Sequence, residues 1–339
     1  MKRHLLLFFI LLSTTTSFSQ ETINTVINTL RERIHLMGYI QAGYTYDQYA
    51  DPDNSFDIKR IIFMADGKIT DDWSCFFMYN FNGGGTLLEA YTDYRLLPGL
   101  KARFGQFKVP YTIESPLSPT VVELIDCYSQ ATNYLAAIGN HDPLRGPTSG
   151  RDLGFMVFGD LFKNKLTYHL GVINGQGINT KDRNSQKDVL ASLMIKPTGW
   201  LSVGGSAVVG KGSAVGSSDA NPGIQAGDDY KRDRWAVGAV IDTRPVTLRT
   251  EYLGGKDGNV KSDGYYAVAS FHVIPKLDLI ASYDYLNKNK ELSDKQTNYI
   301  AGIQYWFYPR CRLQAQYTYC DKKNGENSNL LQAQVQVRF

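Results

Sequence analysis

The chain has 339 residues, and its 36 Lys and Arg stand against 33 Asp and Glu, which gives a formal net charge of +3. This near balance excludes the strongly basic character of a nucleic-acid-binding chain, and it leaves the sign of any small charged partner open. Hydrophobic residues make up 43% of the sequence, with 22 Tyr, 16 Phe and 31 Gly, a composition that fits a β-rich chain.

The first 34 residues are expected to lie outside the main fold. A basic start, Met1 to His4, precedes an apolar run over 5–12 and small residues up to Ser19, which predicts a secretory signal peptide over 1–19. The apolar run is shorter than the roughly 20 residues that a membrane span needs. Apolar residues recur at helical spacing within 20–34, so this N-terminal periplasmic segment is either a short helix or an irregular leader before the first strand.

From residue 35 onward, two-residue alternation replaces helical patterning. No apolar run approaches the length of a transmembrane helix, which leaves a closed barrel as the way to span a membrane. Short breaks alternate along the chain with longer polar stretches. The short breaks are 70–72, 97–99, 163–165, 197–199, 243–245, 274–276 and 308–310; the longer ones are 47–56, 82–85, 108–150, 175–187, 211–232, 255–263, 288–296 and 322–329.

This rhythm predicts an all-β, transmembrane, antiparallel up-and-down barrel of about 16 strands, with both chain ends on the short-turn side. A secreted β-sandwich would also alternate, but its loops would not sort into short and long. A β-solenoid would need a repeat of fixed length.

The two faces of the predicted strands hold their phase. In residues 86–96, Leu88 and Tyr94 take the lipid-facing phase while Glu89 and Asp93 take the other. A charged side chain facing lipid at mid-membrane costs about 2–4 kcal/mol, so the charged phase is expected to face an aqueous lumen. Aromatic residues gather near strand ends, as in the girdles at a membrane surface.

The last segment, 331–339, alternates at every step and ends on Phe339. This is the form of the closing strand of bacterial outer-membrane barrels. It predicts a location in the outer membrane of a Gram-negative bacterium.

Two motifs flank the longest loop. Residues 105–110 read Gly-Gln-Phe-Lys-Val-Pro, and residues 151–154 read Arg-Asp-Leu-Gly. With these motifs the chain resembles the phosphate-selective porin O/P family over 35–339. The resemblance implies a 16-stranded outer-membrane porin, usually a homotrimer, that passes small anions such as phosphate. It also implies that the third loop, 108–150, folds into the lumen and narrows it.

The resemblance also suggests which residues guide anions. The matching positions are Arg60, Arg103 and Lys108, and lumen phase adds Lys101, Arg249 and Arg312. Within the constriction loop the charged candidates are Glu114, Glu123, Asp126 and Arg145. Residues 109–150 contain no Lys and one Arg, so a phosphate site built from several lysines of that loop is absent from this sequence.

Enzymatic chemistry has little support in the sequence. There is no Gly-x-Ser-x-Gly motif, and the histidines beyond the signal segment are His35, His141, His169 and His272. No Cys/His spacing suggests a metal site, and no cofactor is expected. A Cys127–Cys320 disulfide stays open. We expect a passive channel for small hydrophilic solutes, with outer-membrane lipid and small inorganic anions as partners. The alternative is a barrel with a surface-binding, adhesion or structural role and no anion selectivity.

Overall fold

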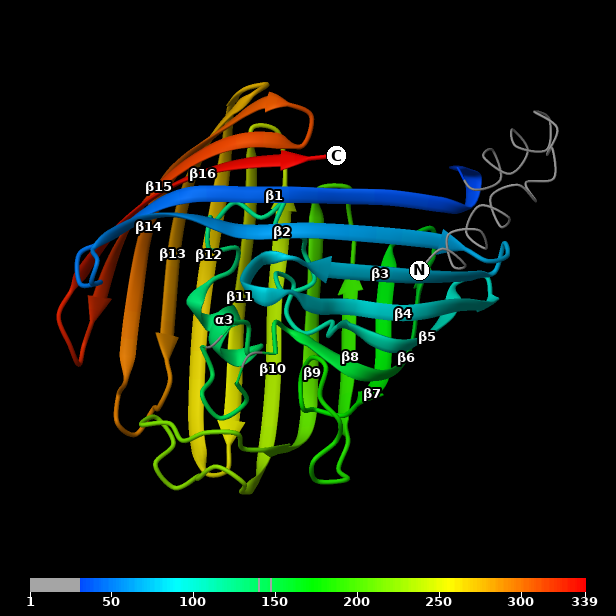
Figure 1. Ribbon diagram of the computed structural model, residues 1–339, viewed down its shortest axis with the longest axis horizontal. Coiled ribbons are helices and arrows are strands. Elements are labelled where there is room, and N and C mark those ends of the chain that lie inside the picture. The colour runs from blue at the N-terminus through cyan, green and yellow to red at the C-terminus, as the bar shows by residue number, and fades with distance from the viewer. Residues whose placement is uncertain (1–30, 140, 147) are drawn as a thin grey trace, which may run out of the picture.

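The computed structural model describes residues 31–139, 141–146 and 148–339, and these form a closed antiparallel β-barrel (Figure 1). The strands are β1 (Ile34–Asp47), β2 (Asn54–Lys68), β3 (Trp73–Asn80), β4 (Thr86–Leu97), β5 (Leu100–Lys108), β6 (Arg151–Leu161), β7 (Leu166–Ile173), β8 (Asp188–Ile195), β9 (Leu201–Ser213), β10 (Asp229–Asp242), β11 (Val246–Asp257), β12 (Val260–Ile274), β13 (Leu277–Asn287), β14 (Lys295–Tyr308), β15 (Cys311–Lys322) and β16 (Ser328–Arg338). Two short helices lie between strands, η1 (Asn82–Gly84) and α3 (Gln130–Leu135). The predicted 16-stranded up-and-down barrel is confirmed.

The first and last strands close the barrel. β1 and β16 pair from Tyr39 opposite Arg338 to Asp47 opposite Leu330. At the rim, the N–H of Gly38 donates to the carbonyl of Phe339 at 3.1 Å, and the N–H of Phe339 donates to the carbonyl of Gly38 at 3.0 Å. This pairing completes the ring of described strands, so the sheet presents no open edge to lipid.

The two faces follow the sequence pattern with one local exception. On β16, Val337 is 47% exposed on the outer face, whereas Gln336 is fully buried on the inner face. The exception is Leu88, which is buried inside the barrel instead of facing lipid. A β-bulge shifts the register between Met78 and Tyr79, so both Leu88 and Glu89 point inward.

The connections sort by length as the sequence predicts, again with one difference. The expected longer loop at 255–263 is a two-residue turn, because β11 extends to Asp257 and β12 begins at Val260. The short turns and both ends of the barrel domain lie on one side, which we term the periplasmic end. The opposite end is termed extracellular.

The third loop, 109–150, lies inside the barrel and packs against one part of its wall (Figure 1). Its α3 helix begins after Ser129, whose hydroxyl accepts a hydrogen bond from the N–H of Thr132 at 3.1 Å. Tyr134 and Leu135 of α3 are buried in the largest apolar cluster, together with wall residues such as Leu253. Hydrophobic burial therefore fixes the loop to the wall in addition to its hydrogen bonds.

Ahead of β1, residues 31–33 are helical, while the predicted signal peptide and residues 20–30 lie outside the described residues. β1 begins at Ile34, one residue before the expected start of the barrel domain. All four cysteines lie in the described part and are free thiols, so the Cys127–Cys320 disulfide is not formed.

Candidate functional site

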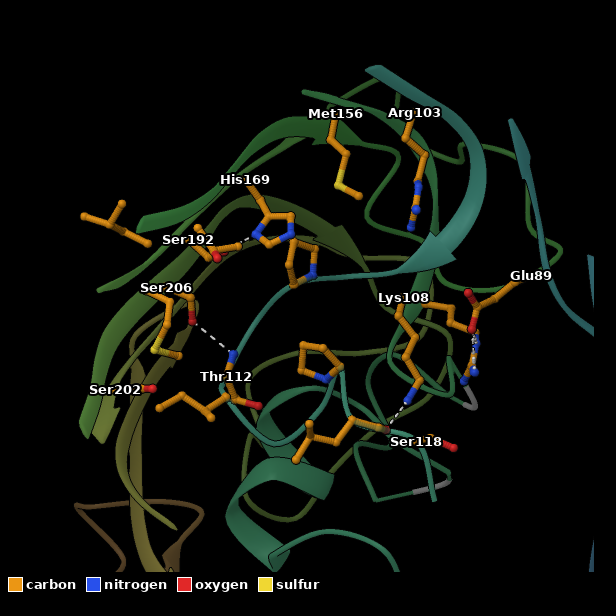
Figure 2. Close-up of a pocket in the computed structure, with 18 of the residues that line it drawn as sticks. Glu89, Arg103, Lys108, Thr112, Ser118, Met156, His169, Ser192, Ser202 and Ser206 are labelled. Atoms are coloured by element: carbon orange, nitrogen blue, oxygen red, sulfur yellow. Dashed lines mark hydrogen bonds and ion pairs between the residues drawn. The ribbon is translucent and has the colours of Figure 1, made fainter. Parts of the chain in front are cut away.

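Two cavities occupy the lumen on either side of the third loop. The periplasmic cavity has a volume of about 600 Å³, and the extracellular cavity has a volume of about 640 Å³. Arg103 and Met156 line the periplasmic cavity close to the short turns, and Figure 2 shows both side chains directed into it. Arg60 and Lys288 line the extracellular cavity close to the longer loops.

Four residues line both cavities, and they form the partition between them: Met78, Lys108, Pro119 and Arg151. They come from β3, the end of β5, the third loop and the start of β6. Lys108 and Arg151 lie directly opposite each other in the register of β5 and β6. Two basic side chains on adjacent strands thus frame the partition.

Lys108 holds the third loop from the wall. Its ammonium donates to the carbonyls of Ser115 at 3.0 Å and Leu117 at 2.7 Å, and to the hydroxyl of Tyr128 at 2.9 Å. Figure 2 shows the Lys108 side chain reaching toward the loop. These acceptors are uncharged, and no carboxylate of the described residues forms an ion pair with Lys108. Lys108 therefore has no acidic partner among the described residues.

Arg151 is a partition residue that the sequence-based set of candidates omits. Its guanidinium Nη2 lies 2.8 Å from Glu89 Oε1 and 3.6 Å from the Met78 sulfur. The signal was present in the sequence, since Arg151 opens the Arg-Asp-Leu-Gly motif. Only the register of β5 and β6 shows that this arginine faces Lys108.

Arg60 lies on the extracellular side of the partition. Its Nη1 donates to Gln41 Oε1 at 2.9 Å, and within the described part of the chain it has no carboxylate partner. The adjacent Lys59 pairs with Asp126 of the third loop at 3.2 Å. Of the predicted loop candidates, Asp126 is thus the one that lines the extracellular cavity.

Arg103 and Lys101 lie on β5 toward the periplasmic end. The guanidinium of Arg103 makes two hydrogen bonds of 2.7 Å with the carboxylate of Asp93 and lies 3.6 Å from the centre of the Tyr91 ring. Arg103 lines the periplasmic cavity as half of an ion pair. Lys101 lies 5.9 Å from the centre of the Phe158 ring and lines neither cavity.

The sequence predicts that Arg249 and Arg312 line the pore, but in the structure the third loop covers both side chains. Arg249 Nη2 lies 2.5 Å from Glu123 and 3.5 Å from Glu114. Arg312 donates to the backbone carbonyls of Pro119 at 3.2 Å and Val122 at 2.8 Å. Both arginines face inward, but their charges are used to hold the loop.

The acidic loop candidates Glu114 and Glu123 lie on the buried side of the loop instead of at a constriction. Glu114 is fully buried and accepts a hydrogen bond from the N–H of Ser129 at 2.9 Å. Burial raises the pKa of the Glu114 carboxyl, while the Arg249 guanidinium opposes that rise. Arg145 lies 3.6 Å from the buried carboxylate of Asp152 and lines a separate cavity of about 470 Å³ near the extracellular end.

His141, His169 and His272 lie apart from one another and have different partners. His169 Nδ1 is 2.8 Å from Ser192 Oγ on the periplasmic cavity wall, as Figure 2 shows. His141 lines the extracellular cavity, and His272 pairs with Asp278 at 2.7 Å. Across the described residues, no group of three or more His, Cys, Asp or Glu side chains is arranged to hold a metal ion.

Comparison with known families gives one match that covers nearly the whole barrel. The model of the family "phosphate-selective porin O and P" matches residues 34–339. No curated protein sequence is significantly similar to the chain. Among the described residues there is no helix with the length and apolar character to cross a membrane.

Solved structures with the same fold include several bacterial porins. An anion-selective porin from Comamonas acidovorans shares 15% sequence identity, with a TM-score of 0.65 over 90% of this chain and 99% of the porin. OmpT of Vibrio cholerae, folded in vitro, shares 12% identity, with a TM-score of 0.66 over 90% and 97%. OprB of Pseudomonas putida shares 10% identity, with a TM-score of 0.66 over 93% and 96%.

Proposed function

Because this chain belongs to the phosphate-selective porin O and P family, it is an outer-membrane diffusion channel of a Gram-negative bacterium, and we propose that it passes small anions in preference to cations. Transport is passive and needs no cofactor or catalytic step. The similarity in fold to an anion-selective porin of Comamonas acidovorans is consistent with this selectivity.

The observation that carries the proposal is the charge around the partition. Among the described residues, Lys108 and Arg60 form no ion pair with a carboxylate, and Arg151 forms one, with Glu89. Five Lys and Arg residues and two carboxylates line the extracellular cavity. In a narrow, low-dielectric passage such an excess attracts anions and repels cations.

Phosphate is the anion that the family name suggests, but the third loop contributes no lysine to bind it. The cations at the partition come from strand ends, Lys108 on β5 and Arg151 on β6. We therefore propose general anion selectivity, with phosphate as one permeant ion. We assign the anion-guiding role to Arg60, Lys108 and Arg103, and we add Arg151 to this set.

The zero-current potential in a KCl gradient across a planar bilayer tests the proposal. The zero-current potential of the unmodified channel is expected to be shifted from zero toward the equilibrium potential of chloride. The double variant Arg60→Gln/Lys108→Gln should lose about fourfold or more of its chloride-to-potassium permeability ratio, since a unit charge acts on an ion at about 8 Å with about 0.5 kcal/mol even at the dielectric constant of water, and with more in a low-dielectric passage.

Lys276→Gln is the matched control, because it removes one positive charge from an exposed periplasmic turn that lines neither cavity. Its permeability ratio should stay close to that of the unmodified channel. A cation-selective unmodified channel, or equal shifts in the control and the double variant, would contradict the proposal.

We also propose the homotrimeric assembly that is usual in the family, which the molar mass of the detergent-solubilised protein would test. The alternative surface-binding role has less support. The third loop is packed inside the barrel, and the N–H of Val215 in the 214–228 loop donates to the carbonyl of Leu144 in the third loop at 2.8 Å. The two largest loops are thus engaged with each other.

A further inference from the structure

One part of the inner wall is apolar, although the lumen of a porin is normally polar. Tyr39, Ile62, Met64, Met78 and Leu88 form a contiguous cluster on the inner face of β1 to β4. We call this cluster the apolar stripe. It is separate from the larger apolar cluster beneath the third loop.

The apolar stripe runs through both cavities. Tyr39, Ile62 and Leu88 line the extracellular cavity, Met64 lines the periplasmic cavity, and Met78 lines both. A solute that crosses the partition therefore passes the accessible atoms of Met64, Met78 and Leu88, which are 8%, 6% and 9% exposed. For a hydrated inorganic ion this surface offers no interaction, because it can neither replace nor complete a hydration shell.

Cations lie directly beside the apolar stripe. Arg151 Nη2 is 3.6 Å from the Met78 sulfur at the partition. Arg60 and Ile62 occupy the same inner face of β2 and both line the extracellular cavity. A molecule that carries an anionic group and an apolar body would contact the cations and the stripe at the same time.

The size of the cavities supports a solute larger than an inorganic ion. Volumes of about 600 and 640 Å³ fall within the range of about 300–1,000 Å³ that sites for small organic molecules occupy. Methionine side chains adapt to irregular apolar shapes and make favourable contacts with aromatic rings. Met78 and Met64 are thus suited to pass a range of apolar bodies without binding one tightly.

We propose that the preferred solutes of this channel are small organic anions with an aromatic or aliphatic body, which the cations attract and the apolar stripe binds transiently. This inference rests on the proposed anion selectivity and adds the class of solute to it. Inorganic phosphate and chloride pass as well, but without the added interaction with the stripe.

Block of the chloride current by carboxylates of equal charge tests the inference. Acetate, butyrate, hexanoate and benzoate are added at pH 7, where all are ionised, and the half-blocking concentration of each is measured beside that of phosphate. The half-blocking concentration should fall along the series. For benzoate it should be about tenfold lower than for acetate, since even one buried methylene can give discrimination of this order. Equal values across the series would overturn the inference.

The variant Met78→Gln removes apolar surface at the partition while it keeps the length of the side chain. The advantage of benzoate over acetate should shrink by about threefold, in line with the free energy of the apolar area removed. Met37→Gln is the matched control, because Met37 packs against the same cluster but lines neither cavity. An unchanged advantage in Met78→Gln, or an equal loss in Met37→Gln, would also overturn the inference.

Two readouts separate this inference from the proposed function. The zero-current potential reports on the cations, and the carboxylate series reports on the apolar stripe. If the channel prefers chloride over potassium but acetate and benzoate have equal half-blocking concentrations, the inference alone fails. If the channel shows no anion preference, the proposed function fails. Heat-modifiable migration on a denaturing gel verifies that each variant is folded, and the wild-type series needs no variant at all.

Discussion

Arginine faces inward from both halves of the barrel wall, but the two halves use it for different tasks. From β11 to β16, Arg249 and Arg312 bond to the third loop and are covered by it. From β2 to β6, Arg60 and Arg151 line the cavities that the loop leaves open. We refer to these as the covered wall and the open wall. The covered wall holds the constriction in place with buried arginines, whereas the open wall meets the solute and also anchors the loop through Lys59 and Lys108.

The difference shows that inward orientation alone does not make a charge functional in transport. Gln316 illustrates the task of the covered wall: its Oε1 accepts from the N–H of Ile125 at 2.7 Å, and its amide donates to the carbonyl of Glu123 at 3.0 Å. On the open wall, Arg60 donates to the side chain of Gln41 and, among the described residues, to no backbone carbonyl of the third loop. Which wall the loop rests against therefore decides which charges a passing ion meets.

The largest effect is expected from removing a charge on the covered wall. Arg249→Met leaves Glu123 and Glu114 without their cation, and breaking a buried ion pair costs about 3–5 kcal/mol. The third loop should leave the wall, and the single-channel conductance should rise. Trypsin should then cut at Arg145, the one Lys or Arg in 109–150, whose side chain is 11% exposed in the docked loop.

Arg95→Met is the matched control for that change. Arg95 pairs with Asp72 at the exposed periplasmic rim, where an ion pair contributes about 0–1 kcal/mol. The third loop of the Arg95→Met variant should resist trypsin as well as the third loop of the unmodified protein does. Equal protease resistance in both variants would show that the covered wall does not hold the loop through Arg249.

A smaller effect is expected from the same substitution made on the open wall and on the face of the third loop that packs against the covered wall. Glu89→Gln removes the acidic partner of Arg151 at the partition, so the chloride-to-potassium permeability ratio should rise about twofold for one added unit of charge some 8 Å from the ion path. Glu123→Gln removes a carboxylate behind the loop and should change the ratio less. Zero-current potentials in a KCl gradient measure both, and equal shifts would remove the distinction between the walls.

The smallest effect concerns pH and the extracellular cavity. Burial lowers the pKa of His141 below its ordinary value of 6.5, so the ring is neutral at pH 7.5 and gains a positive charge only as the pH falls below that value. Anion preference should therefore increase by about twofold or less between pH 7.5 and pH 5. His141→Gln should remove this part of the pH dependence in the same recordings, and an unchanged profile would contradict the role of His141.

Much of the fold follows from local pattern. Strand alternation and the order of short and long connections predict the barrel and its strand count, because each strand must present one face to lipid and the other to water. The pattern fails at Leu88, where a β-bulge turns the side chain from the outer face to the inner face. It also fails at 255–263, where polar residues belong to the ends of β11 and β12 and leave only a two-residue turn.

The candidate site was less accessible from sequence. Phase places Arg60, Arg103, Arg249 and Arg312 inside the barrel, and all four lie there. Phase carries no information about what covers a side chain. Phase does not single out Arg151 either, because its position opposite Lys108 depends on the pairing of two strands that are separated by the whole third loop.

The sequence by itself determined the barrel, its two faces and the closing strand that ends on Phe339, because these depend on a period of two residues and on the cost of exposing backbone or charge to lipid. The tertiary structure alone decided the path of the third loop across the lumen. That path rests on contacts between residues far apart in the chain, such as Arg249 with Glu123, and it divides one set of inward charges into those that brace the loop and those that face the solute.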